Sequence, residues 1–198
     1  MRLQPLSIPG AFLVLAEPIG DARGWFVRSF CQRTLAEYGV HFEVRQANRS
    51  FNQRAGTVRG FHVQRPPHSE QKLLRCVRGA LVDAVLDLRP ESPTFLRWEM
   101  VELTADNRHA LLIPERCSHA LLTLSDATEI SYESTAPYVP AAELGVRWDD
   151  PRLAIPWPGD VRELSGKDAS WPLLDESLEE LQNAMVQTAT PESQAGVG

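Results

Sequence analysis

Residues 56–64 (GTVRGFHVQ) gather side chains that could move protons, and turn-forming residues flank them. The pattern is typical of a short strand. Because side chains alternate between the two faces of a strand, His62 and Gln64 are expected on one face and Phe61 and Val63 on the other. The stretch therefore predicts a strand that carries an imidazole and an amide on one face and packs its other face into a core.

The following stretch, PPHSEQKLLRCVRG, supplies a partner for the polar face. Pro66 and Pro67 mark a turn, and the apolar run after them begins with Lys72. We expect the two strands to form a hairpin across a binding face, so that Lys72 lies near His62.

His62 and His119 together suggest a site for a divalent metal, since imidazole is a common ligand. Where such a site needs a further imidazole and a carboxylate, however, the chain offers Gln64 and Lys72. The ammonium group of Lys72 would repel a divalent cation. We therefore predict that the protein binds no metal here.

The same groups suit abstraction of a proton beside a carbonyl. A neutral imidazole is a general base near pH 7, and a lysine can stabilise the enolate that forms. Inversion of the carbon also needs a proton donor on the opposite face, and Tyr132, in EISYES, could supply it. Each of these residues alone is more often structural, so the hypothesis depends on their combination.

Most of the chain consists of strand-like segments separated by turns. Residues 44–52 (VRQANRSFN) place Gln46, Asn48 and Ser50 on one face, which is either a hydrogen-bonding platform or a solvated sheet face. Residues 80–87, 96–104 and 109–134 add further strands. Short strands at a spacing of about 8 to 12 residues indicate a sandwich or barrel.

Helices are expected only at the edges of this sheet structure. CQRTLAEYG predicts a short helix ending at Gly39, and residues 175–185 predict an amphipathic helix. The Pro- and Trp-rich residues 137–172 suit a wrap over the sheets. We expect residues 1–175 to form one domain, followed by a C-terminal helix and a disordered tail within 176–198.

Composition excludes several classes of protein. The net charge of −6 over 198 residues argues against a nucleic-acid partner. No apolar run reaches the roughly 18 residues of a membrane span, and no signal peptide precedes the first strand, so we expect a cytoplasmic protein. Cys31, Cys76 and Cys117 lack the spacing of a disulfide framework or zinc site.

Seven motifs in one order carry a family resemblance, and they are RGFHVQ, QKLLRCVRG, DLRPESPTF, IPERCSHALLTLSD, the stretch from Tyr132 to Tyr138, GVRWDDP and LSGKD. With them, residues 1–175 resemble the dTDP-4-dehydrorhamnose 3,5-epimerase family. The resemblance implies an all-β cupin jelly roll and a homodimer with exchanged strands. It also implies cofactor-free epimerisation at C3 and C5 of a nucleotide-linked 4-keto-6-deoxy sugar.

The resemblance also implies roles for individual residues. His62 matches the base, Asp168 its orienting carboxylate, Tyr132 the proton donor and Lys72 the group that stabilises the enolate. Tyr138 matches the residue that stacks on the nucleotide base. The remaining matches are substrate contacts, namely Arg23, Gln46, Asn48, Arg59, His119, Glu143 and Lys167.

The chain departs from the family pattern at a few positions. Arg28 stands where the family commonly has a glutamate associated with base recognition. Arg116 and Cys117 replace a glycine and an aromatic residue before His119. A single-carbon epimerase, a 3,4-ketoisomerase and an inactive sugar-nucleotide-binding protein therefore remain open as alternatives.

Overall fold

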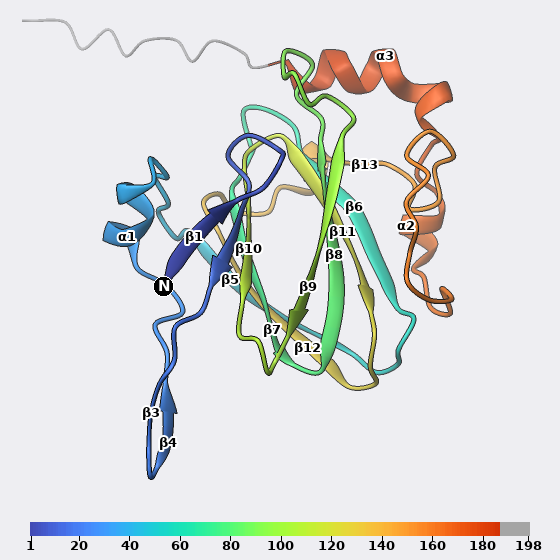
Figure 1. The fold of residues 1–198 in the computed structure, drawn as a ribbon. Helices are drawn as coiled ribbons and strands as arrows, with labels where there is room; N and C mark the ends of the chain where they lie inside the picture. The colour runs from blue at the N-terminus through green and yellow to red at the C-terminus, as the bar shows by residue number, and fades with distance from the viewer. Residues whose placement is uncertain (187–198) are drawn as a thin grey trace, which may run out of the picture.

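Two antiparallel sheets packed face to face dominate the computed structural model, which describes residues 1–186 (Figure 1). In order of neighbours, the six-stranded sheet contains β1 (Arg2–Pro5), β2 (Phe12–Leu15), β10 (Ala110–Ile113), β7 (Lys72–Arg78), β12 (Thr128–Ser134) and β5 (Gln46–Asn52). The five-stranded sheet contains β13 (Glu143–Gly145), β6 (Val58–Gln64), β11 (Cys117–Thr123), β8 (Ala80–Asp87) and β9 (Trp98–Thr104). From β5 to β13 the chain crosses between the sheets at every step except that from β8 to β9, in the manner of a jelly roll, and the predicted all-β cupin-type fold is confirmed.

The other elements are short and peripheral. They are the hairpin strands β3 (Ile19–Asp21) and β4 (Gly24–Phe26), the helices α1 (Gln32–Glu37), α2 (Gly166–Ala169) and α3 (Leu174–Met185), and the 3-10 turn η1 (Pro140–Ala142). The helices α1 and α2 lie on opposite sides of the barrel, and the β3–β4 hairpin projects away from it (Figure 1).

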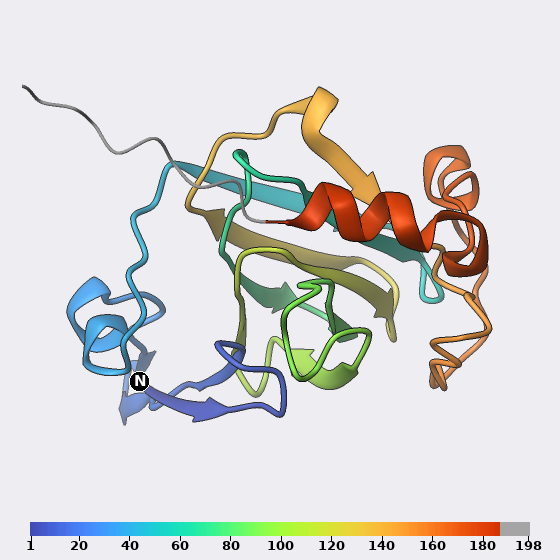
Figure 2. The same cartoon turned by 90° about the horizontal axis from the view of Figure 1, so that it is seen from above.

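The five-stranded sheet is covered on both faces. Between the sheets, Leu81 and Leu121 pack against Leu74 and Ile130 of the facing sheet. On the outer side, a second cluster joins the sheet to α3 and the segment that precedes it (Figure 2). Burial on both faces explains why β8 is a nearly continuous apolar run.

The predicted alternation along β6 is confirmed. Phe61 and Val63 are buried in the outer cluster beneath the C-terminal segment, where Leu181 of α3 also packs. His62 and Gln64 face the space between the sheets. Burying a side chain such as Phe61 contributes about 1.5–3 kcal/mol, so the apolar face of β6 fixes the direction of its polar face.

The predicted hairpin between the strands around His62 and Lys72 is wrong. Those strands are β6 and β7, which belong to different sheets, and the turn at Pro66 and Pro67 carries the chain from one sheet to the other. His62 and Lys72 therefore face one another across the interior instead of lying side by side.

The other predicted elements are found close to their expected bounds. The strand expected over residues 44–52 is β5, and the helix expected before Gly39 is α1, with Gly39 at a φ of 77° beyond its end. The amphipathic helix expected from residue 175 is α3. The predicted disordered tail, residues 188–198, lies outside the described residues. Among residues 1–186, no helix has both the length and the apolar character that crossing a membrane requires.

A buried carboxylate organises the connection between β8 and β9. Asp87, at the end of β8, is fully buried and accepts hydrogen bonds from the guanidinium group of Arg89 at 2.8 Å and from the hydroxyls of Ser92 and Thr94 at 2.6 Å. Burial alone would raise the pKa of Asp87, but these hydrogen bonds outweigh it and lower the pKa from 3.8 to about 2.

Replacing Asp87 with Asn is expected to lower the free energy of unfolding by about 2 kcal/mol at pH 7. This is the free energy that corresponds to lowering the pKa of Asp87 from 3.8 in the unfolded chain to about 2 in the folded protein. Because the folded-state pKa lies below the unfolded-state value, this stabilisation is complete above about pH 4 and disappears as the pH falls toward 2. Urea unfolding of both proteins across that range measures it. A difference that stays constant between pH 5 and about pH 2 would contradict this electrostatic origin.

Candidate active site

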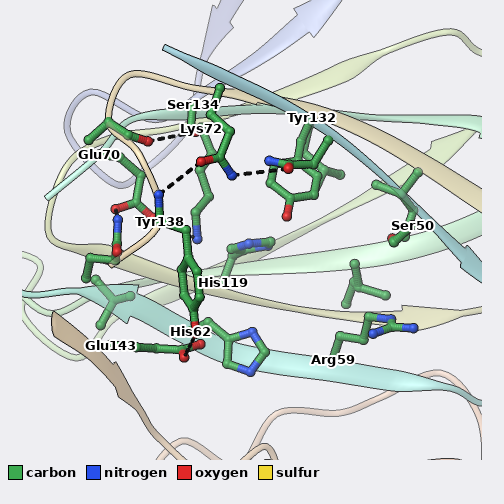
Figure 3. Close-up of a pocket in the computed structure, with 18 of the residues that line it drawn as sticks. Ser50, Arg59, His62, Glu70, Lys72, His119, Tyr132, Ser134, Tyr138 and Glu143 are labelled. Carbon is green, nitrogen blue, oxygen red and sulfur yellow. Dashed lines mark hydrogen bonds and ion pairs between the residues drawn. The ribbon is translucent and has the colours of Figure 1, made fainter. Parts of the chain in front are cut away.

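A cavity of about 370 Å³ between the sheets brings together ten of the twelve predicted site residues. Seven of these are labelled in Figure 3 with further lining residues. The ten residues are Gln46, Asn48, Arg59, His62, Lys72, His119, Tyr132, Tyr138, Glu143 and Lys167. Because Gln46, Asn48 and Ser50 line it, the polar face of β5 is a wall of the cavity and not a solvated sheet face.

Asp168, the eleventh predicted residue, lies directly behind His62. Its Oδ1 is 2.5 Å from Nε2 of His62. Because a carboxylate accepts, Nε2 carries the proton and the lone pair of a neutral ring lies on Nδ1. Burial alone would raise the pKa of Asp168, but the hydrogen bond and charge of His62 and the contact with Ser165 lower it. Asp168 is therefore held as the anion that orients the imidazole.

The position of Asp168 depends on a short helix. Ser165 is the N-cap of α2, and its hydroxyl accepts a hydrogen bond from the backbone N–H of Asp168 at 3.0 Å. Asp168 itself is buried against β6. The C-terminal segment thus delivers the carboxylate to a strand about a hundred residues earlier in the chain.

Tyr132 and Lys72 face His62 from the other sheet. Tyr132 belongs to β12 and Lys72 to β7, whereas His62 belongs to β6 (Figure 3). Burial, followed by the negative charge of Glu70, raises the pKa of Tyr132, so its hydroxyl is protonated near neutral pH. The imidazole of His62 and the protonated phenol of Tyr132 therefore lie on opposite walls, and Lys72 lies on the same wall as Tyr132.

A second histidine–aspartate pair lies beside the first. His119 is the cross-strand neighbour of His62, and its Nδ1 is 3.1 Å from Oδ2 of the fully buried Asp83. Burial lowers the pKa of His119, and the positive charge of Lys72 reinforces that effect, while the carboxylate of Asp83 opposes it. A neutral His119 bonded in this way presents its other ring nitrogen to the cavity as a hydrogen-bonding group.

Two carboxylates at this site, Asp83 and Glu70, were not among the predicted site residues. Asp83 did leave a signal, because it is a charged residue within the apolar run ALVDAVLD. Glu70 left none, since it lies in the polar stretch after Pro66 and Pro67. It nevertheless lines the cavity and is buried.

Three groups form a hydrogen-bonded chain at one side of the cavity. The hydroxyl of Tyr138 donates to Oε2 of Glu143 at 2.6 Å, and Nζ of Lys167 contacts the same carboxylate at 2.6 and 2.7 Å. Burial alone would raise the pKa of Glu143, but both hydrogen bonds lower it. Because Tyr138 is about half exposed, at 49%, its ring face is available to a flat ligand group.

Simple alternation along β6 does not account for Arg59, which lines the cavity together with His62. The pairing of β6 with β11 explains it, since His119 pairs with His62 and Leu121 pairs with Arg59. Three residue steps on β6 therefore oppose two on β11, which is a β-bulge that restores Arg59 to the cavity face.

Arg23 is the one predicted site residue that lies away from the cavity. It occupies the turn of the β3–β4 hairpin, its side chain is 90% exposed, and its guanidinium group pairs with Asp21 of the same hairpin. The described chain alone does not bring Arg23 to the other residues.

No group of three or more His, Cys, Asp or Glu side chains is arranged to hold a metal ion within residues 1–186. Gln64, at the position where a metal site would need another imidazole, has its amide engaged by Glu70 and the backbone of Val139. The donor set therefore does not fit a divalent cation.

A cupin-type barrel that holds an imidazole and a protonated phenol on facing walls is suited to acid–base catalysis. Residues 5–176 match the sequence profile of the family described as dTDP-4-dehydrorhamnose 3,5-epimerase. A relative with that name from Sinorhizobium fredii is 40% identical over 177 residues, covering 89% of this chain and 91% of the relative. The chain belongs to the dTDP-4-dehydrorhamnose 3,5-epimerase family, an isomerase family.

Two further comparisons bear on the reaction. The crystal structure of the Bacillus anthracis dTDP-4-dehydrorhamnose 3,5-epimerase with TDP and PPi bound has a TM-score of 0.85 and 38% identity, covering 87% of this chain and 99% of that one. A dTDP-4-dehydrorhamnose 3-epimerase from Streptomyces niveus is 39% identical, covering 89% of this chain and 86% of the relative. Enzymes named for two carbons and for one are thus about equally similar to this chain.

We predict that Gly60→Ala disrupts the bulge that orients Arg59 and His62. Gly60 has a φ of 121°, and an added Cβ would lie 2.4 Å from the carbonyl oxygen of His119 and 2.6 Å from Cα of Ala120. The strain and the clash are expected to cost at least about 2 kcal/mol of unfolding free energy, which chemical denaturation measures.

Gly159→Ala is the matched control, because an added Cβ there meets no atom within 4 Å. It should change the free energy of unfolding by less than about 0.5 kcal/mol. Equal effects of the two substitutions would show that the close approach at Gly60 is unimportant.

Proposed function

We propose that this protein epimerises a dTDP-linked 4-keto-6-deoxy sugar at C3 and C5, converting dTDP-4-dehydro-6-deoxy-D-glucose to dTDP-4-dehydro-L-rhamnose. One observation carries the proposal, namely that His62, backed by Asp168, and Tyr132 occupy opposite walls of one cavity. Inversion of a carbon requires a base on one face of the sugar ring and a proton donor on the other. The arrangement supplies both.

The reaction consists of two proton transfers at each carbon. The 4-keto group acidifies the hydrogens at C3 and C5, and Nδ1 of His62 removes one of them as the C–H electrons form an enolate. The ammonium group of Lys72 stabilises the negative charge that develops on the keto oxygen. Tyr132 then donates its proton to the opposite face of the carbon, which restores the ketone. No electrons are gained or lost overall, so no redox cofactor is needed.

The remaining cavity residues suit the nucleotide and sugar. Arg59 carries a permanent positive charge for a phosphate group, and the exposed ring of Tyr138 can stack on a base. Gln46, Asn48, His119, Glu143 and Lys167 provide hydrogen-bonding groups around the same volume. Fixing the nucleotide holds the reacting carbons near His62, which contributes to the rate through proximity.

A single-carbon epimerase is the second candidate. The Streptomyces niveus 3-epimerase is as similar as the 3,5-epimerases reported above, and the base and donor needed for one carbon are those needed for two. A 3,4-ketoisomerase would move the carbonyl group and is distinguished by its product. An inactive binding protein is disfavoured because the complete acid–base set is assembled.

Proton NMR of dTDP-4-dehydro-6-deoxy-D-glucose in D2O tests the reaction. Wild-type protein should exchange the hydrogens at both C3 and C5 and form the L-rhamno product, whereas exchange at one carbon identifies the second candidate. His62→Ala should lower exchange about a hundred- to ten-thousandfold, because the base is lost. Tyr132→Phe should slow formation of the inverted product more than it slows exchange. Exchange that survives His62→Ala would refute the assignment of the base.

We also propose a homodimer in which the β3–β4 hairpin of each protomer reaches the cavity of its partner. The hairpin exposes Ile19, Trp25 and Phe26 at 73%, 56% and 66%, an apolar surface that a second copy would cover. Arg108 stacks on Trp25 at 4.3 Å and ties the hairpin to its own barrel. Arg23 at its turn would then join the partner's phosphate-binding residues.

Complementation between inactive variants tests this arrangement. Arg23→Ala and His62→Ala should each have low activity, but co-expressed chains form mixed dimers in which one cavity has both an intact His62 and an intact Arg23. About a quarter of wild-type activity is expected, since half of the dimers are mixed and each has one complete site. If Arg23 serves its own cavity, mixing restores nothing.

The cytoplasmic location stays a prediction. So does the division of the chain into a catalytic domain of residues 1–175 and a C-terminal extension. The packing of Leu174, Leu181 and Met185 of α3 into the outer cluster supports a helix attached to the barrel.

A further inference from the structure

Glu70 is a buried carboxylate that the proton transfers do not use. Its side chain is only 6% exposed, yet it lines the cavity in which the enolate would form. A fixed negative charge there opposes the development of another one, and burying a carboxylate is costly unless its oxygens have partners. Contacts that Glu70 makes with its neighbours must therefore offset the cost of placing its charge in the cavity wall.

The two oxygens of Glu70 contact two different groups. Oε1 is 3.2 Å from Nζ of Lys72, and Oε2 accepts a hydrogen bond from Nε2 of Gln64 at 2.7 Å. The Lys72 side chain is itself largely buried, at 14% exposed. One carboxylate thus connects the ammonium group on β7 with the amide on β6, across the gap between the two sheets.

Gln64, which Glu70 holds, also contacts the segment that carries Tyr138. Its Oε1 accepts from the backbone N–H of Val139 at 2.5 Å, and its Nε2 also lies 3.1 Å from the carbonyl oxygens of Pro137 and His68. The amide has two N–H groups for three acceptors, and the charged one, on Glu70, makes the strongest bond. Glu70 therefore fixes the orientation of the amide.

We propose that Glu70 is a positioning residue for the epimerisation, acting through Lys72 and, by way of Gln64, through the segment that holds Tyr138. A lysine side chain has many rotamers, so an unpaired Lys72 would spread its charge over the cavity. The contact with Glu70 directs the ammonium group to one place before substrate binds. This inference rests on the proposed function, in which Lys72 stabilises the enolate.

Lysine usage makes the proposal directly measurable. The sequence contains only two lysines, Lys72 and Lys167, and both line the cavity. Lys167 pairs with a different carboxylate, Glu143, at 2.6 Å. Protein labelled with 15N-lysine therefore gives two ammonium signals, one of which reports on Glu70 while the other is an internal control.

Glu70→Gln separates the two contacts of Glu70. Its amide oxygen can still accept from Gln64, but the NH2 group then faces the ammonium group of Lys72, which is also a donor. We expect the Lys72 ammonium signal of the substrate-free protein to broaden through faster exchange with water, while the Lys167 signal does not change. An unchanged Lys72 signal would overturn the proposal even if the protein had no epimerase activity.

Steady-state kinetics of the Glu70 variants test whether the position of Lys72 affects the rate of epimerisation. Glu70→Gln is expected to lower kcat about ten- to a hundredfold, the range for losing one charge-assisted hydrogen bond, with dTDP affinity within about twofold. Glu70→Ala removes both contacts and should also weaken dTDP binding. Faster turnover of Glu70→Gln would show that the carboxylate weakens Lys72 instead of positioning it.

A double-mutant cycle separates positioning from general damage to the fold. In a Lys72→Met background, Glu70→Gln should change the residual kcat by less than about twofold, because the group it positions is already absent. Losses that multiply would indicate independent effects and overturn the proposal. Glu115→Gln is the control, since it removes an exposed carboxylate that interacts electrostatically with Glu70 but does not line the cavity.

These outcomes distinguish this inference from the proposed function. If wild-type protein exchanges neither C3 nor C5 hydrogens, the proposed epimerase activity fails, while the two ammonium signals still report whether Glu70 holds Lys72. If wild-type protein is active and Glu70→Gln behaves like wild type in both arms, the inference alone fails.

Discussion

The bond between His62 and Asp168 depends on packing between distant segments of the chain. It joins β6 to a four-residue helix about a hundred residues later, and neither element could hold the other in place alone. What brings them together is the outer cluster, in which Phe61 and Val63 of β6 pack beneath the C-terminal segment. The apolar side of the strand thus positions the partner of its polar side.

The order of the strands in the two sheets also brings residues together across the cavity. The chain crosses from one sheet to the other between β5 and β6 and again between β6 and β7, so residues that are close in sequence reach opposite walls of the cavity. Gln64 and Glu70 are six residues apart, yet their bond spans from the end of β6 to the approach to β7. A jelly roll therefore places His62 and Lys72 on different walls with only a short connection between them.

Periodicity and composition predicted the parts of this structure that local rules control. The alternation of His62 with Phe61 follows from the geometry of any strand, and the apolar run of β8 follows from its burial on two faces. Residue types pointed to His62, Lys72 and Tyr132, whereas Tyr138, Glu143 and Lys167 were expected only from the family resemblance.

The predictions that failed concern features that depend on contacts between distant segments. Arg59 reaches the cavity only through a bulge opposite β11, and alternation alone would have turned it outward. The strands around His62 and Lys72 were expected to pair, whereas the turn at residues 66 and 67 leads from one sheet to the other. Glu70 went unnoticed because a glutamate in a polar stretch has no local sign of burial.

The charges around the cavity are nearly all paired, and this bears on how an anionic substrate is bound. Lys72, Lys167 and His119 each contact a carboxylate, as His62 does. Arg59 differs, because its Nε donates to the neutral Asn52 at 2.7 Å, and no carboxylate within the described residues lies in ion-pair range.

The paired and unpaired cations of the cavity therefore suit different tasks. A paired ammonium is held in place but has a reduced net field, which suits a charge that must appear at one atom during the reaction. An unpaired guanidinium keeps its full charge for a ligand that arrives already ionised, and its planar fork matches phosphate oxygens. In a chain with a net charge of −6, Arg59 is therefore the cavity cation best suited to attract the diphosphate of the proposed substrate, and the paired groups are better suited to its sugar.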